Sequence, residues 1–249
     1  MLTMDRLREV ITEGRSIELL NDGIYTVLSK TSQHYQYDQK AAIYDFLVSS
    51  RLYNRISWGT SPDSYVAFAA QAVKSDQRGL LLDAGCGSLV FTARAHLESG
   101  RPVIACDQSL DMLHRARRRL MRLSGSNSEQ IILLQADLSD PPFQAASFQT
   151  ILCMNLLHHL ADAAGLLQGL KATLVGGGQL YLTTLVKNNR FVGDRYLNLL
   201  HKQGWIVRPR NEVELKRLVE DALSINPGYK LEGNMAYVTA AVAQTRNGN

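Results

Sequence analysis

The stretch Leu80-Leu81-Leu82-Asp83-Ala84-Gly85-Cys86-Gly87 decides the fold of this chain. Three consecutive leucines predict a strand that is buried on both faces, as in a parallel sheet. Gly85 and Gly87 permit a tight turn and a close approach of the backbone to a ligand, where a Cβ atom would clash. Residues 89–98 fit a helix, so the free N–H groups at its start would face that ligand. The stretch therefore predicts a strand, a loop and a helix that together bind a nucleotide-like group.

A second carboxylate follows the next predicted strand. Residues 103–106 are apolar, and Asp107 comes twenty residues after Gly87. In a doubly wound nucleotide site, an acid at this place holds ribose hydroxyls. The dinucleotide fingerprint would need a glycine where Val90 stands, and Asp83 would repel a pyrophosphate but could serve a ligand that carries an ammonium group. Both features disfavour a nicotinamide-dependent oxidoreductase.

From residue 79 onward, predicted strands alternate with predicted helices. The strands are 80–83, 103–106, 131–135, 148–154 and 179–184, and the helices are 89–98, 109–123, 161–174, 194–202 and 212–223. Residues 229–232 and 235–243 are expected to pair antiparallel at the sheet edge, and Gly176-Gly177-Gly178 is expected to be a connecting loop. Alternation of this kind indicates βαβ units and a parallel sheet with right-handed crossovers.

The domain organisation follows from two elaborations on this core. Residues 1–77 are expected to form an N-terminal helical cap or lid, because Leu7, Val10 and Ile11, then residues 17–24, have helical spacing. Ser61-Pro62-Asp63 can start a further helix. Residues 78–249 are expected to form the ligand-binding core, with an inserted lid segment at 186–211.

Composition narrows the class of protein. The chain has 249 residues, of which 45% are hydrophobic and 20% are charged, as in a soluble globular domain. It has no apolar run of about 18 residues and no secretory signal, so a cytoplasmic location is expected. Cys86, Cys106 and Cys153 lack Cys-x-x-Cys spacing, which favours buried thiols over a metal site.

The balance of charge is modestly basic. The net charge is +4, and arginines at 115, 117, 118, 119 and 122 spread around most of a helical turn without interleaved aromatic residues. This arrangement favours a solvated helix face over an RNA-binding surface. We therefore expect a small-molecule partner rather than a nucleic acid.

The glycine-rich loop resembles motif I of the class I S-adenosylmethionine (SAM) dependent methyltransferases, with Leu89 in place of the usual third glycine. Asp107, the Ala136-Asp137-Leu138 segment and the Leu157-His158-His159 segment extend the resemblance, which is strongest to the small-molecule branch with the ubiquinone and menaquinone methyltransferases. The resemblance implies an α/β, Rossmann-like, doubly wound sheet of seven mostly parallel strands in the order 3-2-1-4-5-7-6.

The same resemblance implies which residues bind SAM. They are Asp83, Gly85, Cys86, Gly87, Asp107, Gln108, Met112, Ala136, Asp137, Leu138, Met154 and Asn155. Asp137 would accept a hydrogen bond from the adenine amino group. Tyr53 and Trp58 would cover the positive sulfonium with their aromatic faces, unless they are core residues of the cap.

The implied activity is in-line transfer of a methyl group to a small, partly apolar molecule. His158 and His159 are candidates for a general base, or alternatively pack as structural residues. Asp140-Pro141-Pro142-Phe143 is similar to a motif that grips a planar nitrogen, but it precedes the fourth strand, so we interpret it as a packing loop. The alternatives are a non-catalytic SAM-binding or regulatory protein, which Leu89 keeps open, and an RNA methyltransferase.

Overall fold

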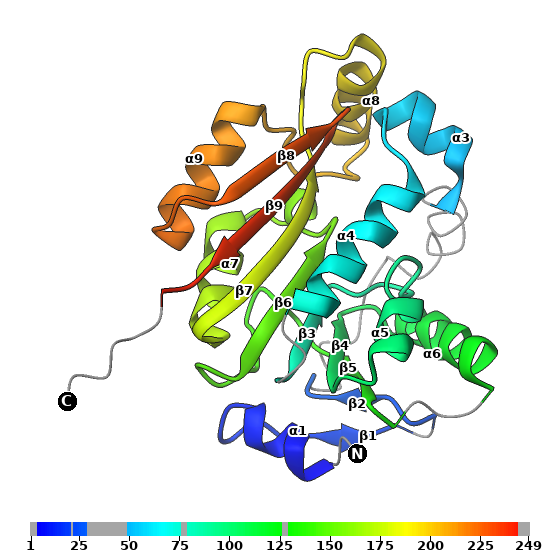
Figure 1. Ribbon diagram of the computed structural model, residues 1–249, viewed down its shortest axis with the longest axis vertical. Coiled ribbons are helices and arrows are strands. Elements are labelled where there is room, and N and C mark those ends of the chain that lie inside the picture. The colour runs from blue at the N-terminus through cyan, green and yellow to red at the C-terminus, as the bar shows by residue number, and fades with distance from the viewer. Residues whose placement is uncertain (1–3, 21, 29–48, 76–78, 126–128, 244–249) are drawn as a thin grey trace.

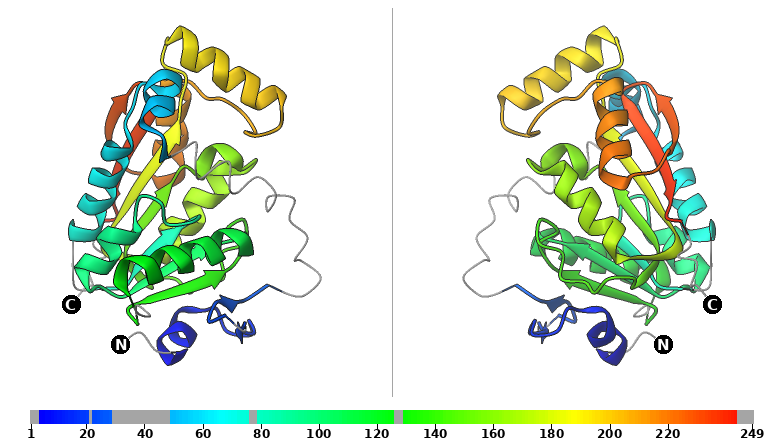
Figure 2. Two further views of the ribbon diagram at one scale, coloured as in Figure 1. Left: turned by 90° about the vertical axis from the view of Figure 1, so that its right-hand side faces the viewer. Right: turned by 90° about the vertical axis from the view of Figure 1, so that its left-hand side faces the viewer.

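The computed structural model describes residues 4–20, 22–28, 49–75, 79–125 and 129–243 (Figure 1). Nine strands in these residues form one mixed sheet, in the order β1-β2-β5-β4-β3-β6-β7-β9-β8. Helices cover both faces of the sheet (Figures 1 and 2). The α/β, Rossmann-like class predicted from the sequence is thus the class observed.

Five parallel strands form the centre of the sheet. They are β3 (Leu81–Ala84), β4 (Val103–Asp107), β5 (Ile131–Gln135), β6 (Phe148–Met154) and β7 (Leu174–Leu185). β9 (Met235–Ala241) pairs antiparallel with β7, and β8 (Gly228–Glu232) pairs antiparallel with β9. Because β3 to β7 run in one direction, the loops that follow them gather at one edge of the sheet.

Alternation along the strands divides the core between the two faces. Leu80 and Leu82 pack with helices α1 (Met4–Val10), α7 (Ala163–Thr173) and α9 (Glu212–Leu223). Leu81 packs on the other face with α5 (Ala93–Ser99) and α6 (Leu110–Ser124). Successive side chains of a strand point to opposite faces, so a run of three leucines serves both layers at once.

The sheet has nine strands, so the predicted number of seven is wrong, but the strands from β3 to β9, numbered from β3, lie in the predicted order 3-2-1-4-5-7-6. β1 (Glu18–Leu19) and β2 (Tyr25–Thr26) extend the sheet beyond β5, where helical spacing had predicted helix. The edge of β5 has backbone groups that need partners, and the Val27 N–H donates to the Gln135 carbonyl at 3.1 Å. This pairing outweighs the helical periodicity of so short a segment.

Two further predictions near glycines are wrong. Gly176-Gly177-Gly178 lies within β7 rather than in a loop, beside a register shift between Phe148 and Thr150. Glycines are tolerated at such an irregularity because no side chain has to pack there. The predicted helix over 89–98 begins only at Ala93.

The parts of the predicted cap lie at two ends of the molecule (Figure 1). Residues 4–20 and 22–28 lie beside β5. The helix α3 (Arg51–Tyr53), the π-helical turn η3 (Asn54–Trp58) and the predicted helix α4 (Pro62–Ser75) lie along the opposite half. Tyr35, Tyr37 and Tyr44 lie outside the described residues. The insertion carries α8 (Phe191–Lys202), which projects beyond the end of the sheet (Figure 2). None of the helices in the described ranges has the length and apolarity that a membrane span requires.

Candidate active site

A cleft of about 210 Å³ opens at the carboxyl edge of β3, β4, β5 and β6. Ten of the residues predicted to bind SAM line it, namely Gly85, Gly87, Asp107, Gln108, Met112, Ala136, Asp137, Leu138, Met154 and Asn155. They come from four loops that are far apart in sequence. The parallel strands bring these loops together.

The glycine loop has the backbone conformation that its sequence predicts. Gly85 and Gly87 have φ angles of 70° and 52°, in the region that favours glycine. A Cβ atom on Gly85 would lie 2.9 Å from the Leu156 side chain, whereas one on Gly87 would have no atom within 4 Å. The missing Cβ of Gly87 therefore leaves open space in the wall of the cleft.

Asp107 fastens this loop to the start of α6. One carboxylate oxygen accepts from the Gly87 N–H at 2.8 Å, and the other accepts from the Ser109 N–H at 2.9 Å. Burial raises the pKa of Asp107, although its hydrogen bonds from Ser109 and Gly87 act in the opposite direction. The carboxylate is thus preorganised between two backbone amides at the rim of the cleft.

Asp83 and Cys86, which were predicted to bind SAM, do not line the cleft. The Asp83 carboxylate is buried and lies 2.8 Å from His96 Nε2, which α5 packs against it. The Cys86 thiol is directed to the Gly87 carbonyl at 3.5 Å, and burial raises its pKa well above the usual range. The two side chains contact α5 and the loop itself, and contact of either residue with SAM stays a prediction.

Leu89 stands where motif I usually has its third glycine, and it keeps a glycine-like backbone. Its φ angle is 58°, which costs an L-residue roughly 1–2 kcal/mol. The side chain is fully buried against Val103 and Leu113, and burial of a leucine contributes about 1.5–3 kcal/mol. Leu89 therefore has a backbone conformation that favours glycine, and burial of its side chain offsets the cost.

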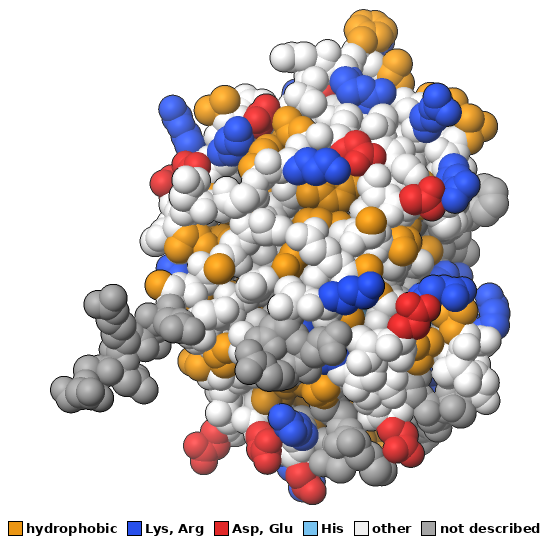
Figure 3. Space-filling model, in the orientation of Figure 1, with side chains coloured by type: hydrophobic (Ala, Val, Ile, Leu, Met, Phe, Trp, Pro, Cys, Tyr) orange, Lys and Arg blue, Asp and Glu red, His pale blue; other side chains and the backbone are white. Residues whose placement is uncertain are grey.

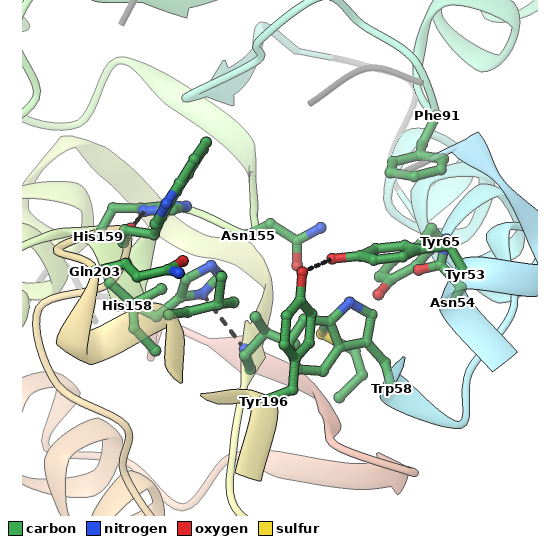
Figure 4. A pocket seen from close by; sticks show the side chains of 15 residues that line it. Tyr53, Asn54, Trp58, Tyr65, Phe91, Asn155, His158, His159, Tyr196 and Gln203 are labelled. Atoms are coloured by element: carbon green, nitrogen blue, oxygen red, sulfur yellow. Dashed lines mark hydrogen bonds between the residues drawn. The ribbon is translucent and has the colours of Figure 1, made fainter. Parts of the chain in front are cut away.

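A second cavity of about 190 Å³ adjoins the cleft (Figure 4). Aromatic rings from η3, α3 and α8 form one wall: the Tyr53 hydroxyl donates to the Tyr196 hydroxyl at 3.2 Å, and the Trp58 and Tyr196 ring centroids are 5.1 Å apart. Tyr53 and Trp58 line this cavity and not the cleft. η3 packs against α8 at this wall, and contact of the two rings with the sulfonium stays a prediction.

His158 is a buried neutral side chain. The Leu185 N–H donates to its Nδ1 at 3.4 Å, and the Thr184 hydroxyl lies 3.1 Å from the same atom. An amide can only donate, so Nδ1 is an acceptor and the neutral ring carries its proton on Nε2. Burial lowers the pKa of His158 well below its usual value, and His159 and Arg210 add to this effect.

His159 has the opposite tautomer. Its Nδ1 lies 2.8 Å from the Trp205 carbonyl, which can only accept, so Nδ1 carries the proton and Nε2 is the basic nitrogen. Burial lowers the pKa of His159, while the bond to Trp205 raises it. The ring is therefore neutral near pH 7 and oriented by a backbone carbonyl.

Asn155 and His159 line both the cleft and the second cavity. Asn155 has a φ angle of 56°, and its N–H donates to the Thr183 carbonyl at 2.9 Å. Its side-chain oxygen also accepts from the Thr183 hydroxyl at 3.1 Å. A strained residue that its neighbours hold in place is typical of a functional site.

Sequence reasoning missed the residues that hold η3 and the 186–211 insertion together. Asn234, fully buried in the turn between β8 and β9, donates from its side chain to the Val186 carbonyl at 2.9 Å and from its N–H to the Trp58 carbonyl at 2.7 Å. A Cβ atom on Gly193 of α8 would lie 1.8 Å from the Asn234 amide oxygen. The Gly233-Asn234 turn dipeptide and a glycine inside a helical pattern were the available signals.

The Asp140-Pro141-Pro142-Phe143 segment and the cysteines, which were also candidates on sequence grounds, line neither cavity. Phe143 is buried against Phe148 with ring centroids 5.0 Å apart, which confirms the packing loop at residues 140–143. Cys86, Cys106 and Cys153 are free. Within the described ranges, no three His, Cys, Asp or Glu side chains form a group that could hold a metal ion.

Comparison with known proteins points to one family. The family model described as "Methyltransferase domain" matches residues 82–180. A ubiquinone biosynthesis O-methyltransferase of Idiomarina loihiensis is 27% identical, over 56% of this chain and 55% of that protein. A tRNA U34 carboxymethyltransferase of Alteromonas mediterranea is 33% identical, over 48% of this chain and 38% of that protein.

Among solved structures, phosphoethanolamine N-methyltransferase 2 of Haemonchus contortus, in complex with SAM, shares the fold. Its TM-score is 0.64 at 15% identity, and the match covers 85% of this chain and 59% of that one. The chain spans between 30% and 55% of the length of the first curated relatives that it matches.

Proposed function

We propose that this chain, which belongs to the class I, Rossmann-like SAM-dependent methyltransferases, transfers a methyl group from SAM to a small, uncharged, partly apolar acceptor. The observation that carries the proposal is that the cleft and the second cavity share Asn155 and His159. A donor in one and an acceptor in the other would meet at these two residues.

Two features of the cleft support SAM as its ligand. The open space at Gly87 gives room for a ligand against the backbone, and the Asp107 carboxylate stands where ribose hydroxyls would reach it. Asp137, after β5, remains our candidate for the adenine amino group. Bound SAM would supply a sulfonium methyl group that a nucleophile displaces in line.

The second cavity fits an uncharged acceptor. Its described lining is mainly aromatic and aliphatic, and it includes no Asp, Glu, Lys or Arg. A charged acceptor would lose its hydration there without gaining an ionic partner. A neutral acceptor with an apolar body and one polar reacting group is the class that this lining favours.

His159 can take up a proton from such an acceptor. Its Nδ1–H bond to the Trp205 carbonyl directs the basic Nε2 nitrogen for this task. His158 is a hydrogen-bond donor through Nε2 and would orient the acceptor rather than deprotonate it. We further propose that residues 49–60 and 186–211 act as lids that exclude water from the junction.

The test is binding of SAM by isothermal titration calorimetry, with NAD as the negative ligand. Asp107→Asn removes the carboxylate charge but still accepts one amide bond, and we expect SAM affinity to fall about tenfold or more. Asp140→Asn, an exposed carboxylate outside the cleft, is the matched control and should bind SAM normally. Heat with NAD and none with SAM would contradict the proposal.

The acceptor class is tested separately. The protein is incubated with methyl-labelled SAM and a cell extract, which is then divided into small molecules, bulk RNA and protein. We expect the label in the small-molecule fraction. Label in RNA would identify the RNA methyltransferase alternative, and SAM binding without label in any fraction would identify the non-catalytic one.

A further inference from the structure

Large apolar side chains are exposed on residues 49–60 and 186–211, the two proposed lid segments. We call this part of the molecule the lid end. The part of the chain that the structure describes exposes eleven large hydrophobic residues, and five of them lie on α3, η3 and α8. They are Leu52, Ile56, Phe191, Val192 and Leu199, with 68% of Leu52 and 76% of Phe191 exposed. We call these five residues the lid-end apolar patch. Clustered exposure of this kind marks an interaction surface.

The geometry of α8 explains the exposure. Helical spacing places Phe191, Arg195 and Leu199 on one side of α8, and the Arg195 guanidinium lies 5.3 Å from the Phe191 ring centroid. Tyr196 and Leu200, on the other side, line the second cavity, which we call the acceptor cavity because the proposed function places the methyl acceptor there. The helix therefore has two apolar sides, of which one faces the cavity and the other faces solvent.

The lid end is also strongly basic. Residues 49–60 contain Arg51 and Arg55 and no acid, and residues 186–211 contain six Lys and Arg side chains and one acid, Asp194. Asp194 is turned inward, where it accepts from the Asn234 side chain at 2.6 Å. Asp63 and Glu214, which lie outside these ranges, pair with Arg51 and Arg208, so eight basic residues stand against three acids. The resulting charge of +5 still exceeds the net charge of +4 of the whole chain. Figure 3 shows basic and hydrophobic side chains together over α8 and α3.

We propose that the lid end docks on the surface of an anionic lipid bilayer. Exposed aliphatic and aromatic side chains would enter the interface, and the arginines and lysines would attract the anionic headgroups. RNA would satisfy the positive charge but would leave Leu52, Ile56 and Val192 without an apolar partner. An anionic bilayer offers partners to both the apolar and the basic side chains of the lid end.

Docking here would also give an apolar acceptor a direct path. Tyr53 and Trp58 line the acceptor cavity from the same elements that carry Leu52 and Ile56 outward. An acceptor dissolved in the bilayer could enter the cavity without crossing water. This delivery rests on the proposed function, whereas the docking itself does not.

The experiment is vesicle flotation with the full chain. Vesicles of phosphatidylcholine alone are compared with vesicles of equal parts phosphatidylcholine and phosphatidylglycerol, at low and at high ionic strength. We expect binding to the anionic vesicles that falls at high salt. Leu52→Ser with Phe191→Ser should weaken that binding about tenfold or more, because each buried side chain contributes to insertion. Arg55→Gln with Arg195→Gln should weaken binding to the anionic vesicles, and the loss should be larger at low than at high ionic strength.

A matched double variant separates the patch from general hydrophobicity. Leu123→Ser with Val213→Ser removes exposed apolar side chains from α6 and α9, and vesicle binding should not change. Circular dichroism confirms that each variant is folded, whether or not it binds SAM. Calorimetric binding of SAM then keeps failure of docking distinct from failure of the proposed function. Absence of vesicle binding, or equal loss in the control pair, would overturn the proposal. So would binding of bulk tRNA instead of vesicles, or a dimer that the Leu52 and Phe191 changes dissociate.

Discussion

At the scale of single residues, the two adjacent histidines differ in which ring nitrogen carries the proton. The Leu185 amide makes Nδ1 of His158 an acceptor, whereas the Trp205 carbonyl makes Nδ1 of His159 a donor. The sequence shows two equivalent imidazoles after β6. Their hydrogen-bond partners come from β7 and from the loop after α8, so only the tertiary structure distinguishes them.

His159→Asn should reduce methyl transfer to a hydroxyl or similar proton-releasing acceptor on the order of 10²-fold. The Asn amide can keep the bond to the Trp205 carbonyl, so only the basic nitrogen is removed. Burial lowers the pKa of His159, so wild-type kcat should stay level as pH falls to about 6.5 and decline only below it. The pH profile of kcat is the measurement. His158→Asn should change the acceptor KM more than kcat, and the reverse pattern would exchange the two roles.

The burial of neutral His158 should make the fold sensitive to acid. The pKa of His158 is near 6.5 in the unfolded chain and well below that value in the folded one, so between the two the unfolded state binds a proton that the folded state does not. The free energy of unfolding should therefore fall as pH drops below 6.5, by at most about 1.4 kcal/mol per pH unit from this residue.

Urea denaturation at about pH 7.5 and about pH 5.5 measures this dependence. His158→Gln should flatten it, whatever its effect on stability at neutral pH. Asn198→Ala, exposed on α8 and without a titratable group, is the control and should leave the slope as it is. An unchanged slope in His158→Gln would mean that another group titrates.

At the scale of elements, the position of α8 depends on the absence of a Cβ atom at Gly193. The helix approaches the β8–β9 turn so closely that the Gly193 position is within contact of Asn234 and of the Ser57 carbonyl. Asn234 in turn bonds the Trp58 carbonyl, so a single turn fixes both lid segments.

Gly193→Ala should displace α8 and disturb the acceptor cavity without affecting the cleft. We expect stability to fall by roughly 1–3 kcal/mol, because the new methyl group meets packed atoms. SAM affinity should stay within twofold, while the acceptor KM rises several-fold. Calorimetry with SAM and steady-state kinetics with the acceptor separate the two effects. Asn198→Ala, exposed on the same helix, should change neither quantity, and a loss of SAM affinity in Gly193→Ala would contradict the division into cleft and cavity.

At the scale of the whole molecule, positive charge is divided between α6 and the lid end. On α6, Arg119 donates to the Ser88 carbonyl at 2.6 Å and so supports the glycine loop. Arg118 and Arg122 are exposed to solvent. Only the latter two can be changed to test a role in binding a macromolecule.

Arg118→Ala with Arg122→Ala should leave methyl transfer to a small acceptor within twofold of wild type, because neither side chain lines the cleft or the acceptor cavity. The measurement is kcat/KM for that acceptor at low and at physiological salt. If the wild type transferred methyl groups to bulk RNA and this variant did not, α6 would be a nucleic-acid-binding surface, contrary to this prediction.

The sequence determined the central sheet and the residues of the cleft at its carboxyl edge. Apolar runs such as Leu80-Leu81-Leu82 can only be buried on both sides, and parallel strands put Gly87, Asp107 and Asp137 at one edge whatever surrounds them. These features depend on local patterns and on a single topological rule. Ten cleft residues could be predicted for that reason.

Only the tertiary structure decided the rest. The buried partner of Asp83 is His96 of α5, and β2 pairs with the edge of β5 although its residues have helical spacing. The acceptor cavity is formed where η3 and α8, about 140 residues apart in the chain, pack on the turn at Asn234. Contacts between distant segments leave no period or spacing in a sequence, because each side chain there is chosen by a partner that the local pattern does not contain.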